Sequence, residues 1–193
     1  MLAPMPTLTF RHASIDDMPA IVALVTAAYR GDSSRLGWTT EADLLDGQRV
    51  DISVLESDLT RPDSYVILAE TTGGPDNAED EAELVGCAHV CKDELGRGYF
   101  GMFAVDPRGQ GAGLGKQILA EAERVAADLW SARTMTMSVI DLRADLIAFY
   151  ERRGYRRTGV YKAFPYGDDR FGLPRRDDLR LEVLEKELTP GPR

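Results

Sequence analysis

The 193-residue sequence contains few of the side chains that form disulfide frameworks or bind metals. It has two cysteines and two histidines, too few cysteines for the bridged scaffold of a small secreted protein. No apolar run approaches the ~20 residues that a membrane-spanning helix needs. The first seven residues also lack the basic and apolar regions of a signal peptide. These absences predict a cytoplasmic protein without a membrane partner.

Metal-binding residue types come close together in sequence at Cys87, His89 and Cys91. These residues alternate along a predicted strand, so the outer two Cα atoms would lie ~13 Å apart. Tetrahedral zinc holds its sulfur ligands at ~2.3 Å from one centre. The spacing therefore excludes a three-ligand site on this strand, and we expect no bound metal.

Basic residues are outnumbered by acidic ones, and the net charge of −9 excludes the basic footprint of a nucleic-acid-binding protein. An acidic surface tolerates a cationic small molecule, although acidity that serves solubility alone explains the charge as well. The apolar content of 44% and charged content of 28% are typical of a globular domain. We expect one domain over residues 1–193.

Hydrophobic periodicity predicts alternating strands and helices. Strands are expected over residues 7–13, 64–70, 84–91, 99–105, 134–140, 156–163 and 179–188. Helices are expected over residues 15–29, 40–45, 51–59 and 114–129, with one more that carries residues 146–150 and ends at Gly154. An acidic stretch, 72–83, is predicted to be a mobile hairpin loop, and the Pro/Gly-rich stretch 164–178 is either a lid or a surface insertion.

The predicted strand at 99–105 leads into an unusual glycine pattern. Pro107 ends the strand, and glycines then occupy positions 109, 111, 113 and 115 before an amphipathic helix. Glycine allows tight turns and close approach, and amides at a helix start attract anions. This arrangement predicts a diphosphate site.

Two familiar diphosphate loops do not match. A Walker loop needs glycine at position 110 and serine or threonine at position 117, and both are glutamine. The dinucleotide fingerprint G-x-G-x-x-G fails because its third glycine would fall on Leu114 or Lys116. A generic nucleotide-binding protein is therefore disfavoured.

The pattern that does match is Gln110-x-x-Gly113-x-Gly115 after Val105-x-Pro107. It resembles the acetyl-CoA signature of the GNAT N-acetyltransferase superfamily. A second block, Phe149-Tyr-Glu-Arg-Arg-Gly-Tyr155, is similar to the last block of that family. The resemblance implies an α/β fold with a mixed, mostly antiparallel central sheet of six or seven strands and helices on both faces. The strands at 99–105 and 134–140 would run parallel at its centre and splay apart.

The resemblance also implies a binding mode for acetyl-CoA. Its diphosphate would lie on the main chain of the glycine loop, at Gln110, Gly111, Ala112, Gly113, Leu114, Gly115 and Lys116. Pantetheine would bond to unpaired main-chain groups along Phe103, Ala104 and Val105. Lys116 or Arg153 would supply further charge for phosphate. Where the family often has asparagine, this sequence has Arg143, which suits a phosphate or a carboxylate.

The implied reaction moves an acetyl group to the amine of a small molecule or peptide. A lysine-like amine, with a pKa of ~10.4, needs a base or a desolvating pocket, and the departing thiolate, with a thiol pKa of ~8.5, needs a proton. Tyr150 fits the proton donor by position. Asp141 is the predicted base, with Glu70, His89 and Tyr99 as rivals. Histone-acetylating relatives have a glutamate base where this sequence has Tyr99, so a carboxylate base is absent at that position.

The acceptor pocket is predicted to include Trp38, Glu41, Tyr99, Phe164 and Tyr166. Trp38 and the nearby carboxylates would suit an ammonium group, although a solvated acidic face with a core tryptophan is an equal alternative. An alternative function is a catalytically weak CoA-binding sensor, and the family also makes a homodimer plausible.

Overall fold

The computed structural model describes residues 8–71 and 82–189. Its centre is a seven-stranded sheet of order β1-β3-β4-β5-β6-β9-β7, in which only β5 and β6 pair in parallel. The strands are β1 (Leu8–His12), β3 (Ser64–Thr71), β4 (Glu83–Lys92), β5 (Gly98–Val105), β6 (Thr134–Ile140), β7 (Arg156–Ala163) and β9 (Arg180–Glu187). The predicted fold class is confirmed.

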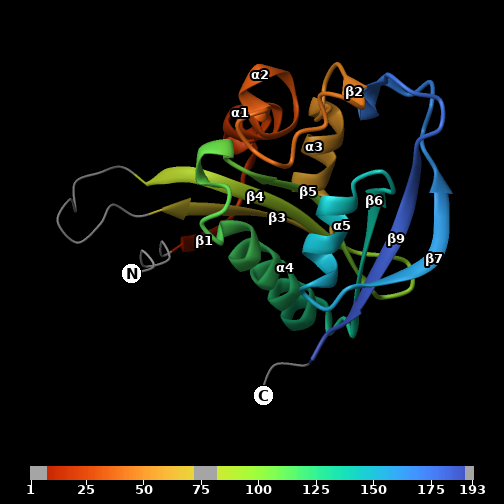
Figure 1. Ribbon diagram of the computed structural model, residues 1–193. Coiled ribbons are helices and arrows are strands. Elements are labelled where there is room, and N and C mark those ends of the chain that lie inside the picture. Colours follow the sequence, from red (N-terminus) through yellow and green to blue (C-terminus); the bar gives the residue numbers. More distant parts are fainter. Residues whose placement is uncertain (1–7, 72–81, 190–193) are drawn as a thin grey trace, which may run out of the picture.

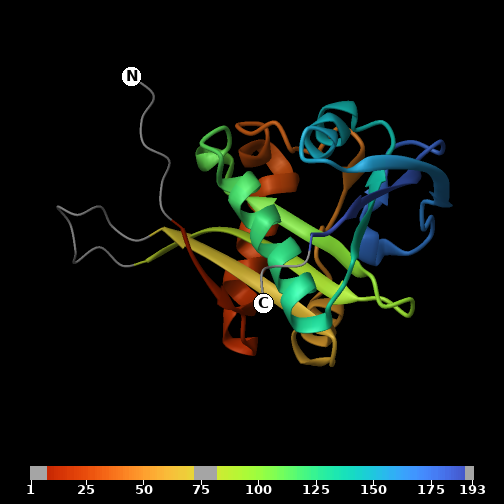
Figure 2. The same ribbon diagram turned by 90° about the horizontal axis from the view of Figure 1, so that it is seen from below.

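Helices cover both faces of the sheet (Figures 1 and 2). One face carries α1 (Met18–Tyr29) and α3 (Ile52–Thr60). The other carries α4 (Leu114–Trp130) and α5 (Ala144–Glu151). The remaining short helices are α2 (Gly31–Ser34), η1 (Ile15–Asp17), η2 (Pro107–Gly109) and η3 (Asp169–Phe171). Each face has its own apolar core because the central strands are buried on both sides.

The two central strands part soon after they meet. Their parallel pairing is limited to Gly98 with Met135 and Tyr99 with Thr136. Beyond this point β5 carries a bulge against β4, where Met102 adopts a left-handed φ of 40°. A bulge bends its strand and sharpens the local twist. The splay implied by the family resemblance is therefore present, and it opens a gap between β5 and β6.

The predicted helix at residues 40–45 is wrong. The amides of Leu44 and Leu45 both donate to the Glu41 carbonyl in a turn. The chain then forms β2 (Leu45–Asp46), which pairs with β8 (Leu173–Pro174) in a separate two-stranded sheet. That partner lies in the 164–178 stretch, so the pairing depends on a contact that local periodicity does not reveal.

Some expectations fall on parts of the chain outside the described ranges. The acidic stretch 72–83 is described only for its last two residues, of which Glu83 begins β4. Within the described ranges, no helix combines the length and apolar character required to cross a bilayer.

Candidate functional site

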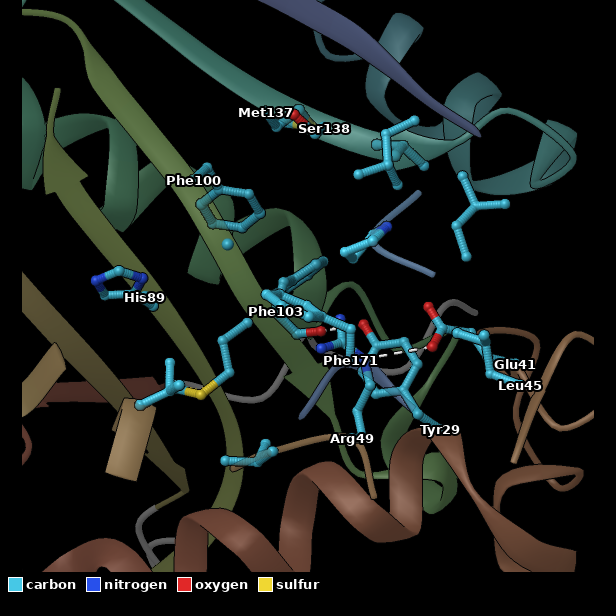
Figure 3. A pocket seen from close by; sticks show the side chains of 18 of the residues that line it. Tyr29, Glu41, Leu45, Arg49, His89, Phe100, Phe103, Met137, Ser138 and Phe171 are labelled. Atoms are coloured by element: carbon cyan, nitrogen blue, oxygen red, sulfur yellow. Dashed lines mark hydrogen bonds and ion pairs between the residues drawn. The ribbon is translucent and has the colours of Figure 1, made fainter. Parts of the chain in front are cut away.

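A cavity of ≈ 310 Å³ lies where β5 and β6 separate. Residues 100–103 of β5 and 137–140 of β6 form opposite walls. Tyr150 from α5 and Phe164 from the stretch after β7 also line it. Tyr29 from α1 and Phe171 complete the lining (Figure 3). The cavity is mainly apolar, with a few polar groups at its ends. This is the usual composition of a small-molecule site.

Tyr150 contributes a phenol to this cavity. The residue is 4% exposed, and its ring packs edge-on against Phe100, Phe149 and Tyr155. Burial raises the pKa of Tyr150 well above its ordinary value. The hydroxyl therefore keeps its proton at neutral pH and is able to donate it.

The glycine loop presents unbonded amides at the start of α4. Gly111 and Gly113 have left-handed φ values of 91° and 83°, which glycine adopts without strain. Across residues 111–116, only the amide of Ala112 donates to a backbone carbonyl of the described chain. A Cβ added at Gly111 would meet no protein atom within 4 Å. The loop is thus an open cradle of N–H groups that fits a diphosphate.

Gly115 has a different role from the other loop glycines. A Cβ at this position would lie 3.1 Å from Cζ of Phe103. The absence of a side chain lets the first turn of α4 approach β5 closely. Lys116 follows it and is exposed in the same turn.

Gln110 faces the protein rather than the cradle. Its Nε2 donates to Thr39 Oγ1 at 2.7 Å and to the Val105 carbonyl at 3.1 Å. Its Oε1 accepts from the Trp38 amide at 2.9 Å. Gln110 thereby ties the glycine loop to β5 and to the segment after α2. Trp38 lies beside this loop with its ring tilted against Phe149, and it is not among the residues that line the cavity.

Two main-chain carbonyls of β5, at the positions expected to bond pantetheine, accept hydrogen bonds within the protein. The Tyr29 hydroxyl donates to the Phe103 carbonyl, and Gln110 donates to that of Val105. The Ala104 side chain packs in the core beneath α1. The carbonyls of Phe103 and Val105 are thus partly occupied, and each keeps a second lone pair.

Glu41 lies at one end of the cavity inside a cluster of arginines. It is 7% exposed, and its carboxylate lies 2.9 Å from Arg30, 3.0 Å from Arg143 and 3.3 Å from Arg49. Burial alone would raise the pKa of Glu41, but the three guanidinium groups outweigh it and lower the pKa. The carboxylate is already neutralised, which argues against the predicted ammonium-binding role.

The two arginines expected near phosphate make contacts within the protein. Arg143 donates to Glu41 at 3.0 Å and to the Thr39 carbonyl at 2.8 Å, and it lines the cavity. Arg153 donates to the Phe149 carbonyl at 2.6 Å and stacks on the Phe149 ring. Both guanidinium groups are therefore held by protein contacts.

Two of the predicted bases lie away from the cavity. Asp141 forms an ion pair of 2.5 Å with Arg180 and is not a lining residue. Glu70 pairs with Arg11 across β1 and β3. Tyr99 and His89 both line the cavity. The geometry therefore leaves His89 and Tyr99 as candidates among the four.

Two polar contacts meet at His89 Nε2. Ser64 Oγ lies 2.6 Å from the Asp58 carbonyl, to which it must donate, and 2.9 Å from His89 Nε2. Since the hydroxyl has one proton, this contact favours hydrogen on Nε2, and Arg61 Nη2, 3.4 Å from the same nitrogen, then makes a charge contact rather than a hydrogen bond. The lone pair is then on Nδ1, which has no partner in the described chain. Burial, with help from Arg61, lowers the pKa of His89 to about 4, so the ring is neutral at pH 7.

The acceptor-side predictions are divided between the cavity and its surroundings. Phe164 packs with Leu45 and Leu179 and lines the cavity. The Tyr166 hydroxyl instead accepts a hydrogen bond of 2.6 Å from the Leu179 amide, and Tyr166 is not a lining residue. Part of the 164–178 stretch thus lines the cavity, and its β8 pairs with β2.

Comparison with known families identifies this arrangement. The model of the Acetyltransferase (GNAT) family matches residues 38–155. The chain belongs to the GNAT acetyltransferase family. The matched range contains the glycine loop, the splayed strands and Tyr150.

Solved structures agree with this GNAT assignment at the level of the fold. The ribosomal-protein-S18-alanine N-acetyltransferase from Escherichia coli has a TM-score of 0.65 at 15% identity, with 97% of each chain covered. Nourseothricin acetyltransferase has a TM-score of 0.63 at 18% identity, over 94% of this chain and 99% of its own. A GNAT acetyltransferase from Staphylococcus aureus has a TM-score of 0.62 at 12% identity, over 95% of this chain and 100% of its own. A search of curated proteins found no match.

Proposed function

We propose that this GNAT protein transfers an acetyl group from acetyl-CoA to an amine, with Tyr150 as the proton donor. The observation that carries the proposal is the buried, protonated phenol of Tyr150 in the gap between β5 and β6. The open amides at the start of α4 add a fitting site for the diphosphate of CoA.

Acetyl-CoA would supply the acetyl group as a thioester: the amine lone pair forms the amide bond and the C–S electrons stay on sulfur, so one proton leaves nitrogen and one reaches sulfur. Tyr150 gives the proton to sulfur, since its phenol is protonated and has no hydrogen-bond partner among the described residues. His89 Nδ1 accepts the proton from nitrogen as the N–C bond forms, when the nitrogen becomes cationic and strongly acidic. Because the pKa of His89 is about 4, the ring then releases the proton to water. The apolar walls favour a neutral amine, which is the form that reacts.

Tyr150→Phe and His89→Gln test these roles. Tyr150→Phe is expected to lower turnover by at least about tenfold with little change in CoA affinity, because general acid catalysis is removed while the cradle stays intact. His89→Gln is expected to lower turnover by roughly 100-fold. Thiol release with an amine panel measures turnover, and titration calorimetry measures CoA binding.

Tyr161→Phe is the matched control because this tyrosine is exposed on β7. Unchanged turnover in Tyr150→Phe would remove Tyr150 from the mechanism. CoA binding without thiol release from any amine would favour the sensor function instead. A protein that does not bind CoA would contradict both functions.

A further inference from the structure

The arginine cluster at Glu41 has more positive charge than its carboxylate balances. Arg30, Arg49 and Arg143 surround one buried carboxylate, which leaves an excess of two positive charges. Buried charges are usually paired, because an uncompensated charge loses its hydration. The excess therefore needs an explanation.

Two of the three arginines donate hydrogen bonds to the protein. Arg30 donates from Nη1 to Glu41 at 2.9 Å, is 6% exposed and does not line the cavity, while its Nε and Nη2 are buried without a hydrogen-bond partner among the described residues. Arg143 donates to Glu41 and to the Thr39 carbonyl. Both side chains bond to the segment between α2 and β2, which contains Glu41. Their charges therefore have a structural role.

Arg49 differs because it lines the cavity and makes no hydrogen bond. Its Nε lies 3.3 Å from Glu41 but is buried without a hydrogen-bond partner. Neither terminal nitrogen bonds to any described residue. The guanidinium carbon lies 4.8 Å from the centre of the Tyr29 ring, within the range of a cation–π contact. Arg49 thus has donors at the cavity that no described residue uses.

Other acidic side chains near this end of the cavity have their own partners. Asp46 pairs with Arg175 at 2.6 Å, and Asp51 accepts the amides of Ser53 and Val54 at the start of α3. Asp58, another acidic lining residue, pairs with Arg61 on the side of His89. Figure 3 shows His89 at the opposite end of the cavity from Glu41 and Arg49. A ligand in the cavity would therefore meet a neutral acceptor at one end and a cation at the other.

We propose that the acceptor is an amine that also carries a carboxylate, which binds the Arg49 guanidinium while the amine lies toward His89. The inference rests on the proposed acetyl transfer and names the substrate class of the same cavity. A carboxylate matches the fork of a guanidinium, and it would neutralise part of the excess charge. A polycationic amine would be repelled by the same cluster.

Matched substrates test the inference. L-Alanine, β-alanine, γ-aminobutyrate and L-methionine are each compared with their carboxamides, which keep the amine and lose the negative charge. The better carboxylates are expected to exceed their carboxamides in kcat/KM by about 30-fold, as for a hydrogen-bonded charged pair. Thiol release with acetyl-CoA provides the rates.

Variants at Arg49 locate the effect. Arg49→Gln is expected to lower kcat/KM for the carboxylates by about 30-fold and for the carboxamides by less than about threefold. Arg49→Lys, which keeps the charge but loses the fork, is expected to fall between. Folding should persist because Glu41 keeps Arg30 and Arg143, and thermal unfolding checks this. Arg175→Gln, at an exposed pair with Asp46, is the control and should change neither substrate class.

The outcomes separate the two proposals. Carboxamides used as well as carboxylates, or equal losses for both classes in Arg49→Gln, would overturn the carboxylate inference while the transferase activity stands. Failure to bind CoA in calorimetry would instead remove the proposed function. A preference for carboxylates that disappears in Arg49→Gln supports both.

Discussion

Gly111 combines a left-handed backbone with an open space where a side chain would lie. Gly159 on β7 has the same combination, with a φ of 74° and no protein atom near an added Cβ. The two positions therefore share the strain of a substitution and differ in their surroundings. Gly111 belongs to the amide cradle and Gly159 does not.

Gly111→Ala and Gly159→Ala should each destabilise the protein by roughly 1 kcal/mol, because alanine is strained at positive φ. Only Gly111→Ala is expected to weaken CoA binding, by about tenfold or more, since its methyl group occupies the space that a diphosphate needs. Urea unfolding and calorimetry measure the two effects. Equal CoA affinities in both variants would contradict the cradle.

At the scale of elements, helix α3 depends on a cap that also borders the cavity. Asp51 accepts hydrogen bonds from the amides of Ser53 and Val54 at 3.0 and 3.1 Å. These amides have no partner within the helix. Since Leu55 of α3 is buried against α1 and β3, loss of the cap should lower the stability of the whole domain.

Asp51→Ala is expected to lower the free energy of unfolding by about 1 kcal/mol. Asp51→Asn should lower it much less, because asparagine is also a good N-cap. The exposed Asp43, which pairs with Arg35, provides a control, and Asp43→Ala should change stability by less than about 0.5 kcal/mol. Urea unfolding followed by circular dichroism measures all three. An alanine variant as stable as the asparagine variant would refute the capping role.

Much of the element order was predictable from sequence because it depends on local periodicity. The sequence predicts an apolar stripe on α4, of which Leu114, Ile118, Leu119, Ala122 and Ala126 are buried and Leu129, near the end of the helix, is exposed. Each predicted strand has a counterpart. The helix predicted at 40–45 fails because Leu45 and Asp46 pair with residues of β8. Such pairing comes from tertiary structure that overrides local preference.

The candidate site was predictable only where residues belong to a motif. The glycine loop and Tyr150 are in recognisable blocks, whereas Arg49 lies in an irregular stretch and gives no periodic signal. Its role depends on Glu41 and Tyr29, which only the fold brings to it. His89 was a rival base, and the hydrogen bond from its ring to Ser64 distinguishes it from Asp141. That contact joins two adjacent strands and is invisible in one sequence.

At the scale of the whole molecule, His89 links stability to pH. Its pKa is about 4 in the folded protein against an ordinary value of 6.5, because burial and Arg61 disfavour the charged ring. The unfolded chain therefore binds a proton that the folded chain refuses between these values. The neighbouring Asp58 has a pKa raised by burial. The folded protein therefore binds a proton there more readily than the unfolded chain, which offsets part of the stability that His89 removes at low pH.

Stability is expected to be unaffected by this group above pH ~6.5 and to fall by up to roughly 3 kcal/mol as the pH drops toward 4. His89→Gln should flatten the pH dependence in this window, whereas His12→Gln should change it much less because His12 is exposed. Urea unfolding at several pH values tests this. An unchanged slope in His89→Gln would contradict the assignment.

The short ladder between β5 and β6 has a mechanical consequence. Two residue pairs join the block of β1, β3, β4 and β5 to the block of β6, β9 and β7 within the sheet. A ligand bound in the gap between β5 and β6 would contact both strands and so stabilise the two blocks relative to each other. Amide hydrogens of β5 and β6 beside this gap should then exchange more slowly when the ligand is bound. Ligand binding would in this way supply the contact that the two strands do not make with each other.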